Sequence, residues 1–301
     1  MRILINRKPV EGPWGGGNLF VKAFCDYFSS LGHDVVHNMD QKVDLMFMQD
    51  PRYSDLGISI NEIVKYKQMN PEVGLVHRVN ECDARKGTQD MDTLLRECSK
   101  FTDLTIFVSN WMEEYHRKLG WHCKKSEVVY NGVDLDHFKK REKIKNGKTN
   151  IVTHHWSDNP LKGSDVYSFL DEFVGKNSQE YTFTYIGRSG VEFKNTNVVK
   201  PLSGKALGQE LSKYDVYVSG SRYDPGPNHV IESVACEMPT ICHQEGGGAL
   251  EFCGPQMSYG TTQELINLLQ DIKDEGNLEN VLKPYSWIDC MKNLEIAIFR
   301  R

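Results

Sequence analysis

Hydrophobic and polar positions along this chain follow two alternating patterns. Short apolar runs rich in β-branched and aromatic residues predict strands, and amphipathic stretches of helical length lie between them. The segment after Gly17 shows the helical pattern clearly, because its apolar side chains recur about every 3.6 residues: Phe20, Val21, Ala23, Phe24 and Phe28.

In the first half, the pattern predicts strands over 2–6, 43–48, 74–78, 104–109 and 127–130, and helices over 18–31, 91–99 and 110–119. In the second half it predicts strands over 150–154, 181–186, 196–199, 215–219 and 239–243, and helices over 164–174, 205–213, 228–236, 262–274 and 287–299. Such alternation is typical of parallel sheets covered by helices. The sequence therefore predicts an α/β protein with two Rossmann-like domains.

A polar, basic stretch over 139–148 separates the two sets of elements. A basic cluster can dock on an anionic membrane, but this one lacks an apolar face, which favours a solvated linker. We therefore expect one domain over 1–140, a second over 141–284, and a C-terminal helical segment over 285–301 that packs back toward the first domain.

Composition narrows the class of protein. The 301 residues are 39% hydrophobic and 26% charged with a net charge of −5, so binding along a nucleic-acid backbone is not expected. No apolar run approaches the ~20 residues of a membrane-spanning helix. The eight cysteines form no C-x-x-C pair, which favours reduced thiols and a cytoplasmic protein.

Three loops follow predicted strands and open predicted helices, where parallel sheets bind ligands. The first, Gly12-Pro13-Trp14-Gly15-Gly16-Gly17-Asn18, lets backbone N–H groups approach an anion, although a flexible loop explains it equally well. In the second, over 154–163, Lys162 can neutralise a diphosphate, although most such lysines are simply solvated. Its neighbours His154 and His155 point to opposite faces of a strand and make a poor metal chelate.

The third loop, over 219–236, is the most informative. A Pro/Gly-rich loop holds Asp224, and Asn228 is a good N-cap for the helix that carries Glu232. Two carboxylates eight residues apart can therefore reach one site. Acidic residues in a first helical turn are also favoured by the helix dipole, which explains Glu232 alone but not the whole stretch. A further glycine run, 246–248, follows the strand over 239–243.

Taken together, these motifs resemble glycosyltransferase family 4, a retaining family with the GT-B fold. The most specific match is Asp224-x₇-Glu232, similar to the family's E-x₇-E motif with aspartate in the first place. The compact length is similar to that of virus-encoded members, including chlorovirus ones. The resemblance is strongest over 127–254, and its other matches are Val129-Tyr130-Asn131-Gly132-Val133-Asp134, Leu161-Lys162-Gly163, Ala235-Cys236-Glu237-Met238-Pro239-Thr240, Gly247-Gly248 with Glu251, and Trp287.

The resemblance implies two domains facing across a cleft, with the acceptor on the N-terminal side and a nucleotide-sugar donor on the C-terminal side. It implies that Glu232 binds the donor ribose, Asp224 orients the transferred sugar and Lys162 neutralises the diphosphate. It implies further donor contacts, near the phosphates, near the base and at a helix start: Gly15, Gly16 and Gly17; Gly187, Arg188, Pro201 and Ser203; and Gly226, Pro227, Asn228, His229 and Val230.

The chain departs from the family by lacking an arginine shortly before Lys162, and Arg188 or Arg222 are the candidates for supplying that charge. The string Asp134-Leu135-Asp136 has the form of a metal-binding motif, but it lies in the hinge segment and is interpreted as structural. We expect no metal or other cofactor. His77 lies near the end of the predicted strand over 74–78, and it is either a catalytic base or a satisfied core or surface residue.

The expected activity is therefore transfer of a hexose to a glycan or glycolipid with retention of configuration. The family's usual donors place GDP-mannose first and UDP-glucose second, and a homodimer is compatible with the sequence. Two alternatives stay open at this stage: a sugar-nucleotide epimerase of the same fold, and a non-catalytic nucleotide-sugar-binding protein.

Overall fold

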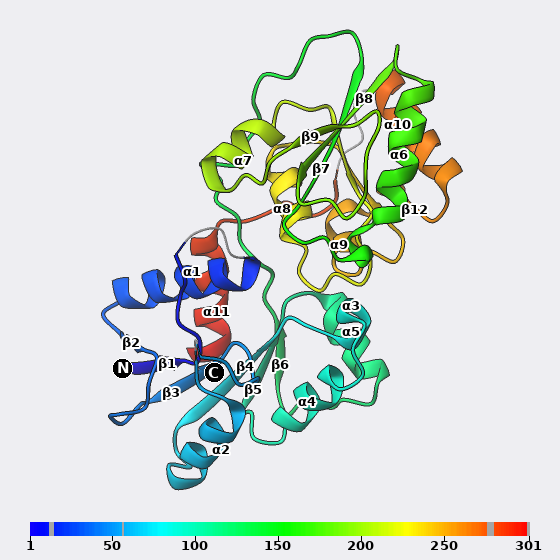
Figure 1. The fold of residues 1–301 in the computed structure, drawn as a ribbon. Coiled ribbons are helices and arrows are strands. Elements are labelled where there is room, and N and C mark those ends of the chain that lie inside the picture. Colours follow the sequence, from blue (N-terminus) through cyan, green and yellow to red (C-terminus); the bar gives the residue numbers. More distant parts are fainter. Residues whose placement is uncertain (12–14, 56, 276–279, 300–301) are drawn as a thin grey trace. The chain divides into compact units, whose positions relative to one another are not determined.

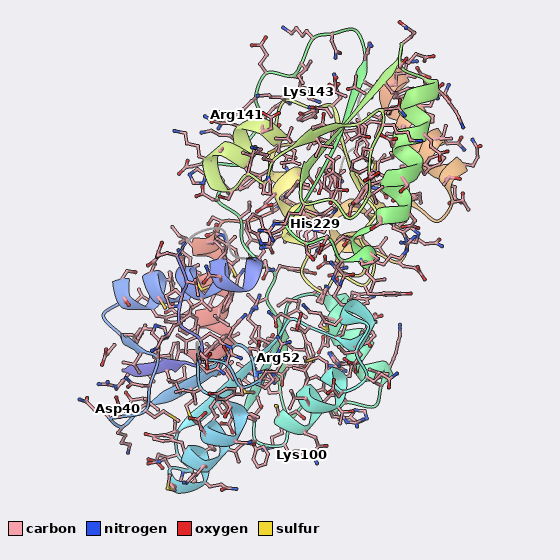
Figure 2. The ribbon with its side chains drawn as sticks, viewed as in Figure 1. Asp40, Arg52, Lys100, Arg141, Lys143 and His229 are labelled. Atoms are coloured by element: carbon pink, nitrogen blue, oxygen red, sulfur yellow. The ribbon has the colours of Figure 1, made fainter. Side chains whose placement is uncertain are left out.

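The computed structural model describes residues 1–11, 15–55, 57–275 and 280–299. Three residues of the glycine-rich stretch (Gly12, Pro13 and Trp14) and the last two of the predicted C-terminal segment lie outside these ranges. The described chain divides into unit 1, residues Met1–Gly132 with Trp287–Arg301, and unit 2, residues Val133–Ser286. Side chains fill the space between the sheet and the helices of each unit (Figure 2).

The elements of unit 1 are β1 (Arg2–Ile5), α1 (Gly16–Ser30), β2 (Asp34–Val36), β3 (Leu45–Met48), α2 (Ile60–Met69), β4 (Gly74–Val79), α3 (Asp83–Lys86), α4 (Met91–Cys98), β5 (Leu104–Phe107), α5 (Asn110–Lys118), β6 (Ser126–Val128) and α11 (Trp287–Phe299). Its six strands are all parallel, in the order β2-β1-β3-β4-β5-β6.

The elements of unit 2 are β7 (Thr149–His155), the 3₁₀ turn η1 (Pro160–Lys162), α6 (Ser164–Lys176), β8 (Tyr181–Gly187), β9 (Asn197–Val199), α7 (Gly204–Leu211), β10 (Val216–Ser219), α8 (Asn228–Ala235), β11 (Thr240–His243), α9 (Ala249–Cys253), the 3₁₀ turn η2 (Pro255–Met257), β12 (Ser258–Tyr259) and α10 (Thr262–Glu275). Its six parallel strands follow the order β12-β11-β10-β7-β8-β9.

The two predicted parallel sheets are thus confirmed, and α6 and α7 lie on opposite sides of the unit 2 sheet (Figure 1). The pattern missed β2, α2, α3, α9 and β12. Four of these are short. The fifth, α2, buries only Ile63, so its apolar stripe is weak. The Ser59-x-x-Glu62 capping box could have predicted the start of α2. In the structure the Ser59 amide donates to the Glu62 carboxylate at 2.9 Å.

The division between the units precedes the basic stretch. Residues that follow Gly132 already pack on unit 2, where Phe138 is 4% exposed. A Cβ added to Gly208 of α7 would lie 2.2 Å from the His137 carbonyl oxygen, so this segment rests directly on the helix backbone. Contacts made by apolar and backbone groups, rather than the run of charges, therefore set the boundary.

Helix α11 returns to unit 1 and packs against α1. The Tyr27 hydroxyl on α1 donates to the Glu295 carboxylate at 2.5 Å, and the rings of Phe28 and Phe299 meet edge to face. On its other side, α1 covers the sheet through Phe24, whose ring centroid lies 4.7 Å from that of Phe47 on β3. Among the described residues, no helix combines the length and the apolar character needed to cross a bilayer.

Candidate functional site

The strand order of unit 2 creates a topological switch point between β7 and β10. The chain runs outward from β7 through β8 to β9 and then returns to β10 on the opposite side of β7, which is the doubly wound order. The loops after β7 and β10 therefore leave in opposite directions. Ligands bind in the crevice that such loops form at the carboxyl ends of the strands.

Two glycines let these loops approach each other. Gly163 has φ +103°, and a Cβ added to it would lie 2.5 Å from Cα of Gly220, directly after β10. An added Cβ at Gly220 would equally lie 2.9 Å from Cα of Gly163. The two loops are thus packed backbone to backbone, which brings the residues beside them, Lys162 and Ser221, to the same site.

Lys162 and Asp224 form an ion pair across the switch point. The Lys162 ammonium lies 3.0 Å from Oδ2 of Asp224, and their side chains are 22% and 9% exposed. The Ser221 hydroxyl donates to the same carboxylate oxygen at 3.2 Å. The structure therefore brings together the two residues that the sequence predicted to act on the sugar and on the diphosphate.

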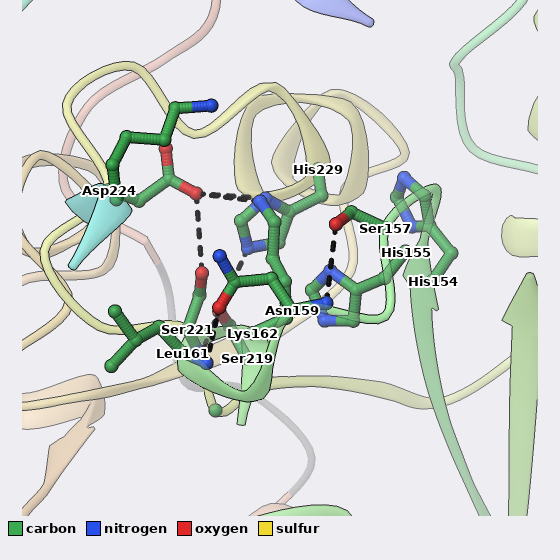
Figure 3. A network of polar contacts seen from close by, with 12 residues as sticks. His154, His155, Ser157, Asn159, Leu161, Lys162, Ser219, Ser221, Asp224 and His229 are labelled. Atoms are coloured by element: carbon green, nitrogen blue, oxygen red, sulfur yellow. Dashed lines mark hydrogen bonds and ion pairs between the residues drawn. The ribbon is translucent and has the colours of Figure 1, made fainter. Parts of the chain in front are cut away.

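A buried histidine supports this carboxylate from the helix side. His229 lies on α8 (Figure 2), with its Nδ1 atom 3.9 Å from Oδ2 of Asp224 and its Nε2 atom 3.0 Å from the Ser219 hydroxyl. Figure 3 shows this network, in which Ser221 and His229 both turn toward Asp224. Hydrogen bonds from Lys162 and Ser221, with the ring of His229 alongside, hold the carboxylate in one orientation, which suits a group that must meet a substrate in a defined geometry.

The second glycine run, Gly246-Gly247-Gly248, contacts the backbone of Asp224. The Asp224 amide donates to the Gly246 carbonyl at 3.3 Å, and the Gly248 amide donates to the Asp224 carbonyl at 2.9 Å. Gly247 has φ +69°, and an added Cβ there would lie 2.7 Å from the Asp224 carbonyl oxygen. The glycines of this run are therefore explained by packing, because the run holds the loop that carries Asp224.

Glu232 projects from α8 toward the end of β7. Its Oε2 atom lies 2.8 Å from Nε2 of His154, and the two side chains are 15% and 9% exposed. The other ring nitrogen of His154 is buried and has no hydrogen-bond partner among the described residues. The carboxylate of Glu232 is thus positioned by a histidine that the sequence had not linked to it.

The start of α8 differs in detail from the prediction. Asn228 is the first helical residue, and Pro227 occupies the N-cap position. The amides of Asn228 and Val230 donate to the carbonyls of Gly226 and Pro227 at 3.0 and 2.9 Å, so neither amide is available to a ligand in this structure. The tight turn through Pro227 uses them itself, which the spacing of the motif did not show.

His155 points away from His154, as expected for neighbours on a strand. Its Nε2 atom lies 2.5 Å from the Tyr167 hydroxyl of α6, and that hydroxyl also accepts the Gly220 amide at 3.0 Å. Across the described ranges, no group of three or more His, Cys, Asp and Glu side chains is placed to hold a metal ion. In the Asp134-Leu135-Asp136 string, Oδ1 of Asp134 accepts the amides of Asp136 and His137 at 3.0 and 3.1 Å and closes a turn.

The residues predicted near the base lie at or shortly after the carboxyl ends of β8 and β9. Gly187 ends β8, and Arg188 follows it with an exposed side chain. Pro201 and Ser203 are exposed and precede α7, with Ser203 at its N-cap position. Arg222, a candidate for the missing charge, donates to the Asp165 carboxylate at 2.9 and 2.6 Å and is therefore already paired.

Gly15, Gly16 and Gly17 open α1 in unit 1. Gly15 has φ −57°, and an added Cβ at this position meets no atom within 4 Å. At Gly17, an added Cβ would make an ordinary contact of 3.5 Å with the Gln49 side chain. Neither the backbone angle nor the packing requires glycine at Gly15, and its role in contacting phosphates stays a prediction.

His77 does not fit the role of a catalytic base. The side chain is 0% exposed, and its two ring nitrogens have no hydrogen-bond partner in the part of the chain that the structure describes. Burial, and to a lesser extent the nearby His116, lowers the pKa of His77 to about 3. A neutral ring enclosed in the core of unit 1 reaches no substrate, so His77 is a core residue, although its ring nitrogens are not satisfied by hydrogen bonds as the alternative had expected.

We expect His77 to make the protein sensitive to acid. The unfolded chain binds a proton near the ordinary pKa of 6.5, whereas the folded chain does so only near 3. The contribution of His77 to the free energy of unfolding is therefore fully present above pH 6.5. It is lost as the pH falls, by up to ~1.4 kcal/mol per pH unit. In urea titrations between pH 7 and pH 4, His77→Leu should show a shallower loss than wild type, whereas a slope equal to that of wild type contradicts the assignment. The exposed His122→Leu is the control.

No protein-family model matches the chain, and no curated protein matches its sequence. Solved structures match it over nearly its whole length. HepE of Anabaena, in complex with UDP and glucose, matches with a TM-score of 0.71 and 13% identity over 100% of this chain and 99% of that one. The lipopolysaccharide outer core galactosyltransferase WaaB matches with a TM-score of 0.71 and 13% identity over 99% of each chain. Sucrose-phosphate synthase from Thermosynechococcus elongatus matches with a TM-score of 0.64 and 15% identity over 90% and 89%.

These likenesses establish the fold. At identities of 13–15%, the chain shares with these proteins an arrangement of two Rossmann-like units, the architecture of GT-B glycosyltransferases. The predicted fold class is therefore confirmed. What such a fold does depends on the site built on it, because one fold serves many functions.

Proposed function

We propose that this protein is a glycosyltransferase that transfers a hexose from a nucleotide-sugar donor to a glycan or glycolipid acceptor. The observation that supports this most directly is a pair of contacts at the switch point of unit 2: Lys162 pairs with Asp224, and Glu232 pairs with His154 near the end of β7. An ammonium group and two partly buried carboxylates at this position suit a ligand with both a diphosphate and hydroxyl groups.

Each of these groups matches one part of such a donor. Glu232, positioned by His154, accepts hydrogen bonds from ribose hydroxyls. Asp224, held by Ser221 and His229, accepts hydrogen bonds from the hydroxyls of the transferred sugar. Lys162 shares its charge between Asp224 and the diphosphate, which gains negative charge as the glycosidic bond breaks.

In the proposed reaction, the bond between the anomeric carbon and the diphosphate oxygen breaks, and its electron pair stays on the diphosphate. The acceptor oxygen bonds to the same face of the sugar, so configuration is retained. The acceptor proton passes to the leaving diphosphate, a route that needs no protein base. This agrees with the enclosed position of His77.

We further propose that the reaction proceeds without a metal ion, with Lys162 as the cation that stabilises the leaving group. HepE structures are described as complexes with UDP and with UDP-glucose. For this reason UDP-glucose is the first donor to test, ahead of GDP-mannose, which the sequence resemblance favoured.

Calorimetric titration with EDTA present tests the proposal. Wild type is titrated with UDP-glucose, GDP-mannose, UDP-N-acetylglucosamine, UDP and GDP, and Glu232→Gln is titrated with each ligand that binds. We expect selective binding of one nucleotide, weakened by about 10-fold in Glu232→Gln through loss of a charged acceptor for ribose hydroxyls. The exposed Glu172→Gln on α6 is the matched control.

Two results would oppose the proposal. Absence of binding by folded wild type, also with candidate acceptors present, contradicts a nucleotide-sugar site. Conversion of the donor to an isomer without any acceptor, seen by product analysis, assigns the protein to the sugar-nucleotide epimerases instead. Sugar transfer to a glycan or glycolipid acceptor supports the transferase.

A further inference from the structure

Tyr223, directly before Asp224, has a left-handed backbone conformation with φ +52°. Among the described residues, Glu237 is the one other residue besides glycine that has a positive φ. For a bulky side chain this backbone region is strained, and it persists only where the surrounding structure holds it. Such residues are concentrated at functional sites, so a strained residue beside Asp224 indicates a role at the candidate site.

Two different segments hold the backbone on either side of Tyr223. Before it, the Arg222 amide donates to the Leu161 carbonyl of η1 at 2.9 Å. The Tyr223 amide donates instead to the Glu245 carbonyl at 2.7 Å, and the Asp224 amide donates to the glycine run that follows Glu245. The chain therefore leaves η1 and joins the glycine run at Tyr223, and the left-handed turn makes this change of direction.

The side chain of Glu245 holds the same turn. The Tyr223 hydroxyl donates to Oε1 of Glu245 at 3.1 Å, and Nε of Arg222 lies 3.6 Å from Oε2. The Glu245 amide donates to Nδ1 of the buried His243, at the end of β11, at 3.1 Å. Glu245 thus fixes both the backbone and the ring of Tyr223, and it is itself tied to a buried strand.

The direction of the Asp224 side chain depends on this turn. Its carboxylate lies 3.0 Å from the Lys162 ammonium, while its backbone is bonded to the glycine run. A negative φ at Tyr223 would rotate the chain that follows. The Asp224 carboxylate would then turn away from Lys162, or the hydrogen bonds to the glycine run would break.

We propose that Tyr223 is a positioning residue for sugar transfer, which aims the Asp224 carboxylate through its left-handed backbone and its contacts with Glu245. The inference rests on the proposed function and extends it by one residue. The strain at Tyr223 is the cost of holding the carboxylate in place before a substrate binds. Because Tyr223 acts through Asp224, it should affect recognition of the transferred sugar and leave recognition of the nucleotide, assigned to Glu232, unchanged.

Substitutions that differ in their tolerance of a positive φ test this role. Valine disfavours a left-handed backbone because it is β-branched, whereas asparagine tolerates it. Calorimetry compares UDP-glucose with UDP, and GDP-mannose with GDP, for wild type, Tyr223→Val, Tyr223→Asn and Asp224→Asn.

We expect Tyr223→Val to raise the Kd of the bound sugar nucleotide about 10-fold, because roughly a tenth of the molecules would keep the turn. The Kd of the bare nucleotide should stay unchanged. Tyr223→Asn should remain within about 3-fold of wild type, since it keeps the backbone conformation. Asp224→Asn removes the charged acceptor itself and should show at least the loss seen in Tyr223→Val.

Glu237→Val is the matched control. Glu237 also lies in unit 2 and has φ +53°, and its side chain is 66% exposed. Its replacement should lower the free energy of unfolding in urea about as much as Tyr223→Val, because the backbone strain is the same. It should change neither Kd, so an effect of stability alone would appear in both variants.

The outcomes separate this inference from the proposed function. If Asp224→Asn weakens binding of the sugar nucleotide and Tyr223→Val does not, the inference is wrong and the proposed function stands. It is equally overturned if Tyr223→Val weakens sugar nucleotide and bare nucleotide alike, or if Tyr223→Asn loses as much affinity as Tyr223→Val. If wild type binds none of the four ligands, the proposed function fails, and the role of Tyr223 fails with it.

Discussion

Lys162→Gln is expected to lower kcat/KM for sugar transfer by about 10²–10³-fold, the usual cost of removing one group that stabilises transition-state charge. The side chain of Lys162 is only 22% exposed and its ammonium lies at the switch point, so water replaces it poorly. The fall should appear mainly in kcat, because the charge on the diphosphate grows as the glycosidic bond breaks. Initial rates with saturating and limiting donor separate the two constants.

Two further variants sharpen this result. Lys162→Arg keeps the charge on a longer, planar group and should recover part of the rate. Lys176→Gln removes an exposed lysine from the last turn of α6, the helix that follows Lys162, and should leave the rate unchanged. Wild-type kcat/KM in Lys162→Gln is incompatible with a leaving-group role for Lys162, whatever the fate of Glu232.

Gly163→Ala should destabilise unit 2 by about 3–5 kcal/mol, through strain at an unfavourable φ and overpacking against backbone. The φ of +103° disfavours any side chain, and the added Cβ would lie 2.5 Å from Cα of Gly220. Neither backbone can move freely, because each connects a buried strand to a helix at the switch point. Urea denaturation without ligand measures the change.

Gly147→Ala separates the two causes. Gly147 also lies in unit 2 and has φ +73°, but an added Cβ there meets no atom within 4 Å. It should cost only the strain of the backbone angle, about 1 kcal/mol. Equal losses in the two variants would show that the contact between Gly163 and Gly220 contributes nothing to stability.

The candidate site was predictable from the sequence to the extent that its residues lie in one loop or one helix turn. Asp224 and Glu232 are eight residues apart within one strand–loop–helix segment, and Lys162 follows a strand in the same pattern. Their partners were not predictable. His154 is 78 residues from Glu232, and Lys162 is 62 residues from Asp224. Only the strand order places them in contact.

His77 shows the reverse case, in which the sequence suggested a functional role that the structure does not support. Its place near the end of a strand, at the carboxyl end of a sheet, suggested a base, since such ends carry functional groups. Whether a side chain on a central strand points into a covered face depends on the helices that pack there, and here the ring has no exposed surface. Burial is a property of the assembled unit, and no local pattern specifies it.

The sequence by itself determined the alternation of strands and helices, the two parallel sheets and the segments that contain the candidate site, because periodicity and turn residues act over a few positions. The tertiary structure alone decided which cations are already paired, which amides are used within a turn, and that His154 contacts Glu232. These facts depend on strand order and register, which join segments far apart in the chain. The local sequence does not specify such long-range contacts, since the same local pattern is compatible with several strand orders.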